Sequence, residues 1–123
     1  MKQLEEAAQL NPEYEAAWRN LGDALVLNNQ AWALATSANG RNRDGVRAVQ
    51  LAETACEETH YQQTIMVGTL AAAYAEAGRF EDAIGAGQKA CALAASRGET
   101  NLLEWNRRLV GRYQAHEAYH EPK

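Results

Sequence analysis

The sequence predicts an all-α fold of stacked antiparallel helical hairpins, and three observations support this prediction. The chain of 123 residues contains 25 alanines and only two prolines, a composition that favours helices over strands. From Leu70 to Ala95, small and large apolar residues alternate as two packed antiparallel helices require. In addition, the apolar pattern of residues 48–56 recurs 35 residues later, at 83–91, which indicates an internal repeat.

The first predicted elements are a short helix and a long one. Residues 2–10 place their apolar side chains on one stripe, and Asn11-Pro12 ends that helix because a residue before proline avoids the helical region. Large residues then keep to one helical face over residues 14–36. The only weak point is Asn28-Asn29. We therefore expect either one helix from about 13 to 37, which is the preferred form, or two helices that break there.

A loop and a second helix follow. Residues 37–42 are predicted to form the loop, because its Asn-Gly pair readily supplies positive φ angles. The next helix is predicted from Asp44 to about Thr59, with His60-Tyr61 closing it. The predicted buried face of this helix consists of Val46, Val49, Ala52, Ala55 and Cys56.

Three further helices are predicted, from residue 62 or 63 to 77, over 80–96, and from 100 to about 113. Gly78 and Gly98 are expected to end the first two, since glycine readily adopts the left-handed conformation. Thr100 has the chemistry of an N-cap for the last helix. The apolar set of that helix is Leu102, Leu103, Trp105, Leu109, Val110 and Tyr113. We expect this helix to cover the open face of a stacked array and to be followed by a polar, frayed tail.

The internal repeat leads to a family resemblance. A known repeat pattern has a Trp, Leu, Gly and Tyr on a first helix and two alanines on a second. One complete repeat of the chain matches it, at Leu70, Ala71, Tyr74, Gly78, Phe80, Ala83 and Ala90. In these residues the chain resembles the tetratricopeptide repeat (TPR) family. Trp18, Leu21 and Gly22 match the opening half of the pattern again. The chain is also similar to the carboxy-terminal repeat block of many bacterial repeat proteins. The resemblance implies a short right-handed TPR-like solenoid with a C-terminal capping helix.

The resemblance also implies a single domain over residues 1–123. Its parts are the end of a preceding repeat (1–12), irregular or truncated repeats (13–61), one complete repeat (62–97), and a capping helix with a polar tail (98–123). The second part departs from the family pattern, because no separate helix fits between Leu25 and Asn28. Leu25, Val26 and Leu27 in a row make this helix apolar on more than one side.

Composition and charge narrow the function classes. The formal net charge of −4 argues against a nucleic-acid partner, which normally requires a basic stripe. No apolar stretch approaches the roughly 20 residues that cross a bilayer, so we expect no membrane contact and a cytoplasmic location. Two cysteines, Cys56 and Cys91, are too few for a disulfide framework and are expected to be packing residues. No cofactor is expected.

The predicted function is a noncatalytic protein-interaction or assembly scaffold that binds a peptide or partner protein in a helical groove. By the repeat register, Trp32 falls on the helix side that lines the concave groove, among amides and charges that suit a peptide-binding hot spot. The candidate groove residues are Arg19, Asn20, Asp23, Asn28, Asn29, Trp32, Thr69, Ala72 and Glu76. The alternative is that Trp32 is simply buried by neighbouring helices.

Two other functions would use other parts of the sequence. Self-association into a homodimer would use the apolar run Leu25–Leu27 of the truncated amino-terminal repeats. A zinc hydrolase would use His116–His120, which matches H-E-x-x-H. That motif lies three residues before the carboxy terminus with no third ligand downstream, so we expect neither a metal site nor an enzyme. A thiol nucleophile formed by a cysteine with His60 is likewise not expected.

Overall fold

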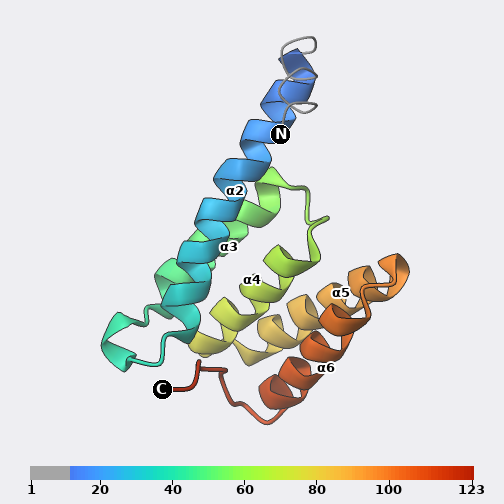
Figure 1. Ribbon diagram of the computed structural model, residues 1–123. Coiled ribbons are helices and arrows are strands. Elements are labelled where there is room, and N and C mark those ends of the chain that lie inside the picture. The colour runs from blue at the N-terminus through green and yellow to red at the C-terminus, as the bar shows by residue number, and fades with distance from the viewer. Residues whose placement is uncertain (1–11) are drawn as a thin grey trace.

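The computed structural model describes the backbone from Pro12 to Lys123 and the side chains from Asn20 onward. The predictions for residues 1–11, and the side chains of Trp18 and Arg19, lie outside this part. All regular elements of the described part are helical, which confirms the all-α prediction (Figure 1). In chain order they are α2 (Pro12–Thr36), the 3₁₀ turn η1 (Gly40–Asn42), α3 (Gly45–Glu58), α4 (Thr64–Glu76), α5 (Phe80–Arg97) and α6 (Thr100–Gln114).

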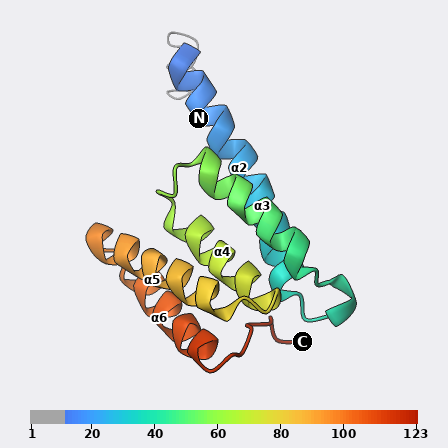
Figure 2. The same ribbon diagram turned by 180° about the vertical axis from the view of Figure 1, so that it is seen from behind.

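Helix α4 lies at the centre of the fold and contacts each of the other α-helices of the described part. Helices α2 and α3 lie on one side of it, and α5 and α6 lie on the other (Figure 1 and Figure 2). The sequence explains this position, because small residues let neighbouring backbones approach α4 closely from several directions. The buried small residues of α4 are Gly68, Ala71, Ala72, Ala73 and Ala75. The expected antiparallel helical hairpins are thus present.

Helix α2 runs without a break from Pro12 to Thr36, so the continuous form of the prediction is confirmed. Four of its residues form a buried stripe along one helical face: Ala24, Asn28, Ala31 and Ala35. Asn28, expected as the weak point, lies inside this stripe and is only 5% exposed. Packing of the stripe therefore outweighs the low helix propensity of asparagine. The amino-terminal turns of α2 extend beyond the end of α3 (Figure 2).

Helix α3 begins one residue later than predicted, with Asp44 as its N-cap. The Asp44 carboxylate accepts a hydrogen bond from the backbone N–H of Arg47 at 3.1 Å. The predicted buried face is wrong at Val46, which is 67% exposed. The cause is Gly45, where a Cβ would lie only 2.6 Å from the backbone nitrogen of Ala77 at the end of α4. This close approach sets the rotation of α3 and turns the next residue toward solvent.

The helix ends follow the predicted signals. Gly78 and Gly98 have φ values of 79° and 69°, as expected for left-handed stops. His60 and Tyr61 close α3 with φ values of 57° and 56°, a conformation that non-glycine residues rarely adopt. The Tyr61 backbone N–H donates to the Cys56 carbonyl oxygen at 2.8 Å, which pairs one of the last carbonyls of the helix.

Helix α6 has Glu99 as its N-cap residue, so the assignment of that role to Thr100 is wrong. The Glu99 carboxylate instead accepts a hydrogen bond from the Thr64 hydroxyl at 2.7 Å. It therefore ties the start of α6 to the start of α4. Three members of the predicted apolar set are buried in α6: Leu109, Val110 and Tyr113.

The segment after α6 folds back onto the helices, so the expectation of a frayed tail is wrong. We name residues 115–123 the C-terminal tail. Ala118 and Tyr119 of this tail pack against the apolar cluster shared by α4, α5 and α6. The backbone N–H of Glu121 donates to the Thr36 carbonyl oxygen, at the end of α2, at 2.7 Å. The tail thus connects α6 back to α2 across the stack (Figure 1).

Candidate functional site

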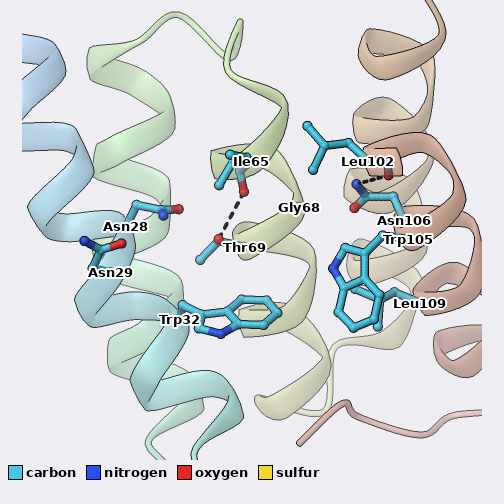
Figure 3. Close-up of a pocket in the computed structure, with 10 residues that line it drawn as sticks. All are labelled: Asn28, Asn29, Trp32, Ile65, Gly68, Thr69, Leu102, Trp105, Asn106 and Leu109. Atoms are coloured by element: carbon cyan, nitrogen blue, oxygen red, sulfur yellow. Dashed lines mark hydrogen bonds between the residues drawn. The ribbon is translucent and has the colours of Figure 1, made fainter. Parts of the chain in front are cut away.

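A cavity opens on the face of the stack where α2, α4 and α6 lie side by side (Figure 3). Its volume is about 270 Å³, close to that of the smaller ligand pockets of proteins. We name it the groove pocket. The residues that line it are Asn28, Asn29 and Trp32 from α2, Ile65, Gly68 and Thr69 from α4, and Leu102, Trp105, Asn106 and Leu109 from α6.

Helix α4 forms the floor of the groove pocket. Ile65 is 56% exposed there, although most of α4 is buried. The Thr69 hydroxyl donates to the Ile65 carbonyl oxygen at 3.0 Å, so it is already paired within the helix. At Gly68 a Cβ would meet the side-chain oxygen of Asn106 at 2.8 Å, so glycine permits the close approach of α6. The floor is consequently narrow and largely apolar.

Helix α2 forms one wall, and the most buried lining residue of this wall is Asn28. This side chain is only 5% exposed, and its Oδ1 atom has no hydrogen-bond partner. A buried amide oxygen without a donor costs about 1–3 kcal/mol of stability. Asn29 beside it is exposed, and Trp32 one turn later is half-buried. The wall therefore combines an aromatic surface with a buried amide oxygen that lacks a donor.

Helix α6 forms the opposite wall. Trp105 is 37% exposed and faces the groove pocket from the side opposite to Trp32 (Figure 3). Asn106 is only 3% exposed, and its amide nitrogen donates to the Leu102 carbonyl oxygen at 2.8 Å. The Asn106 side chain thus makes a hydrogen bond within its own helix, whereas the Asn28 Oδ1 atom has no partner. The two tryptophans give the groove pocket an aromatic surface on both sides.

Tyr119 of the C-terminal tail contacts both tryptophans of the groove pocket, although it is not itself one of the lining residues. The centroid of this ring lies 5.9 Å from the Trp32 ring and 5.2 Å from the Trp105 ring, the second contact being edge-on. The Tyr119 hydroxyl donates to the Glu121 carboxylate at 3.3 Å. Burial, and then the charge of Glu121, raise the pKa of Tyr119. The phenol therefore stays protonated and neutral at physiological pH.

The predicted groove residues are only partly brought together. Four of them line the groove pocket: Asn28, Asn29, Trp32 and Thr69. Asn20 and Asp23 are exposed on α2 but lie outside its lining. The Arg19 side chain falls outside the described part of the chain. Trp32 is half-buried, so it is not simply a core residue. Its indole N–H is already paired, because it donates to the Glu121 carboxylate at 3.0 Å.

Two predicted groove residues on α4 have other roles, which corrects the prediction. Ala72 is only 2% exposed and belongs to the core, because α4 is packed on both flanks. Glu76 lies at the far end of α4, outside the pocket lining. Its carboxylate is 3.5 Å from the Arg43 guanidinium and 2.6 Å from the His120 ring. Both residues thus support the fold around the groove pocket.

The residues that the sequence prediction missed come from α6 and from the first turns of α4. Ile65 lies four residues before Thr69, so helical spacing was a usable signal for it. Trp105 and Leu109 were predicted as part of an apolar set but were assigned to the core of a capping helix. No sequence pattern indicated that α6 forms a groove wall, because this depends on how α6 crosses α4.

The H-E-x-x-H motif does not have the geometry of a zinc site. Helix α6 ends at Gln114, so His116 and His120 do not share a helical face. The His116 ring stacks on Phe80 with centroids 5.0 Å apart, and His120 pairs with Glu76. Within the described residues, no group of three or more His, Cys, Asp or Glu side chains could hold a metal ion.

The cysteines lack the electrostatic setting of a nucleophile. Burial raises the pKa of Cys56 to about 12, and it also raises the pKa of Cys91. A reactive thiol requires the opposite shift, because the thiolate is the nucleophile. Cys56 is fully buried and Cys91 is partly exposed. Neither residue lines the groove pocket.

No family model, curated protein or solved structure matches the chain. No helix in the part of the chain that the structure describes is both long enough and apolar enough to cross a membrane. The groove pocket and the C-terminal tail are therefore the features on which a functional proposal rests.

Proposed function

We propose that this protein is a noncatalytic interaction module, a short TPR-like scaffold that binds an extended peptide segment of a partner protein in the groove pocket. In such a scaffold, alternate helices line one continuous face, as α2, α4 and α6 do around this cavity. We place its work in the cytoplasm, where the two free thiols are compatible with the reducing environment. No nucleic acid, membrane, metal or cofactor is part of the proposal.

The observation that carries the proposal is a cavity with a tryptophan on each of two opposite walls and the unpaired Asn28 Oδ1 atom in its lining (Figure 3). A buried acceptor lowers stability unless a donor reaches it, and the backbone N–H groups of an extended peptide are such donors. Trp32 and Trp105 supply large aromatic surfaces of the kind that dominates binding energy at interfaces. The groove pocket therefore suits a peptide that inserts an apolar side chain and donates one backbone hydrogen bond.

The test is selection of peptides from a random displayed library on the immobilised full chain, followed by affinity measurements on two variants. Asn28→Leu removes the buried acceptor and keeps a similar volume. We expect it to weaken a selected peptide at least about tenfold, the value of one hydrogen bond, while the stability of the fold stays equal or rises. The matched control is Asn20→Leu, an exposed asparagine of the same helix outside the pocket lining.

Two results would contradict the proposal. In the first, no peptide is enriched on the folded chain. In the second, Asn28→Leu and Asn20→Leu weaken the enriched peptides equally. Circular dichroism confirms that each variant keeps its helical content before affinities are compared.

A second candidate function is self-association through α2. Leu25 and Val26 are 45% and 57% exposed, and adjacent exposed apolar side chains of this size are candidates for a second copy to cover. Light scattering across a concentration series should then show a rise in mass that Val26→Glu abolishes and Gln30→Glu, at an exposed position one turn later, does not. A constant monomer mass would exclude this function.

A further inference from the structure

The C-terminal tail contacts the groove in the manner of a bound peptide. Its backbone contributes one hydrogen bond to α2, from the Glu121 N–H to the Thr36 carbonyl oxygen at 2.7 Å. Its side chains contribute Tyr119, which contacts the aromatic surfaces of both groove walls, and Glu121, which accepts from the indole N–H of Trp32. Main-chain hydrogen bonds combined with contacts of alternate side chains are also how many extended peptides are recognised.

The spacing of these contacts defines a simple recognition pattern. In an extended segment, residues two apart point to the same side, which brings Tyr119 and Glu121 together on the groove. The intervening His120 contacts a different element, with its ring nitrogen 2.6 Å from the Glu76 carboxylate on α4. An aromatic residue followed two positions later by a carboxylate is thus the pattern to which this end of the groove is complementary.

Part of the hold on the tail is weak. The His120–Glu76 pair is partly exposed and the Arg112 hydrogen bond to the Ala118 carbonyl oxygen is exposed, whereas the Trp32–Glu121 hydrogen bond is partly buried. Exposed polar pairs contribute little net stability. Ordering the nine residues of the tail also costs conformational entropy, which offsets much of what its contacts contribute. Release of the tail would uncover the parts of the Trp32 and Trp105 rings that Tyr119 contacts.

We propose that residues His116–Lys123 are an intramolecular ligand that competes with the partner, and that the partner carries an extended segment with an aromatic residue two positions before an acidic one. This inference rests on the proposed function, because it assumes that the groove is a peptide site. It adds the chemistry of the peptide and the segment that controls access. Docking within one chain is favoured over binding from outside, because a tethered segment has an effective concentration in the millimolar range.

The experiment measures binding of a fluorescent synthetic peptide with the sequence of residues 116–123, His-Glu-Ala-Tyr-His-Glu-Pro-Lys. It is titrated with the native full chain and with a full-length double variant, Tyr119→Ala/Glu121→Ala, in which the tail is released. We expect the double variant to bind the peptide at least about tenfold more tightly than the native chain, because its own tail no longer covers the Trp32 and Trp105 rings. Fluorescence anisotropy provides the affinities, and circular dichroism checks the fold.

Three controls make the result specific. Glu117→Ala changes an exposed tail side chain that makes none of the groove contacts, and it should bind the peptide as weakly as the native chain. A peptide in which the tyrosine and the second glutamate are both alanine should not bind the double variant. Adding Trp32→Phe to the double variant removes the indole donor and should weaken peptide binding.

The inference is overturned if the native chain and the double variant bind the peptide equally, or if neither binds it while both remain folded. A dimer of the native chain that Tyr119→Ala dissociates would also overturn it, because the tail would then dock on a second copy. Any of these results leaves the proposed function standing if library-selected peptides still bind in a manner that depends on Asn28. Loss of that dependence is what removes the proposed function.

Discussion

The hairpin α2–α3 and the hairpin α4–α5 share a sequence pattern at an offset of 35 residues, yet they are covered differently. On the second helix of each hairpin, Ala48 corresponds to Ala83 and Ala55 to Ala90, and all four are fully buried. The flanks of the two hairpins differ, since α4 packs against α2 on one side and α6 on the other. Small residues at equivalent positions thus specify the packing within a hairpin, and the neighbouring segments specify how deeply the hairpin is buried.

The two cysteines show this difference at a single equivalent position. Cys56 is 0% exposed, whereas Cys91 is only partly buried. Tyr61 packs against the apolar cluster that contains Cys56, and its N–H donates to the Cys56 carbonyl oxygen. The residue 35 positions after Tyr61 is Ser96, which is small and exposed. A bulky residue in the turn, outside the repeated pattern, is therefore one difference between the surroundings of the two thiols.

The second helices of the two hairpins, α3 and α5, also differ in what their first residues contact. Helix α3 begins with Gly45, pressed against the backbone at the end of α4. The position 35 residues later is Phe80, which begins α5 and stacks on His116 of the C-terminal tail with ring planes 3° apart. The first residue of α3 thus packs against a neighbouring helix, and the first residue of α5 packs against the C-terminal tail.

The largest expected effect tests the tight start of α3. Gly45→Ala should lower the free energy of unfolding by about 3 kcal/mol, because its Cβ would lie 2.6 Å from a backbone atom of Ala77 that cannot rotate away. The matched control is Gly85→Ala in α5, where a Cβ meets nothing within 4 Å. That substitution should stabilise the helix by up to about 1 kcal/mol. Urea denaturation measures both, and equal changes would contradict a close packing at Gly45.

The next effect tests how closely α6 approaches the second hairpin. Gly87 corresponds to Ala52, and a Cβ at Gly87 would lie 2.6 Å from a methyl group of Val110. Gly87→Ala should therefore cost about 1–2 kcal/mol of unfolding free energy. In a chain that also carries Val110→Ala, the added cost should largely disappear, since the clashing methyl is absent. Additive losses in this double-mutant cycle would show that the two positions are independent.

A smaller effect compares the thiols by their reactivity. In the native chain, Cys91 should react with a disulfide reagent at least about tenfold faster than Cys56, because Cys56 is fully covered and burial raises its pKa to about 12. Single Cys→Ala variants assign the two rates, and both thiols should react in denaturant. Tyr61→Ala should raise the rate of Cys56 selectively. Similar native rates for the two thiols would contradict the covering role of the turn.

The smallest effect concerns Tyr74, whose hydroxyl joins the hairpins by donating to Glu53 at 3.1 Å. Burial, and then this hydrogen bond, raise its pKa from 10.0 to about 12. Because the folded chain holds the proton more tightly than the unfolded chain, the linked stability is complete below pH 10 and is lost as the pH rises toward 12. Tyr74→Phe should therefore lose less unfolding free energy than the native chain between pH 10 and pH 12, as measured by denaturation at several pH values. Identical slopes for the two chains would contradict the coupling.

Part of the candidate site was accessible to sequence reasoning. Trp32, Asn28 and Asn29 fall on one face by helical register alone, since they share one helix that begins and continues as predicted. The position of Ala72 was not accessible in this way, because α4 is enclosed on both flanks and small residues there pack against neighbouring helices. Trp105 was recognised as apolar, but its place across the groove pocket depends on the crossing of α6 over α4.

By itself the sequence determined the helical class, the order of the hairpins and most of the helix ends, including the stops at Gly78 and Gly98. These features depend on helix propensity and on signals within one or two turns of the chain. Only the tertiary structure decided the rotation of α3 and the docking of the C-terminal tail. The bond from Trp32 to Glu121 joins residues 89 positions apart, and no local pattern encodes such a pairing. It forms because packing of the helices brings both side chains to the same end of the groove.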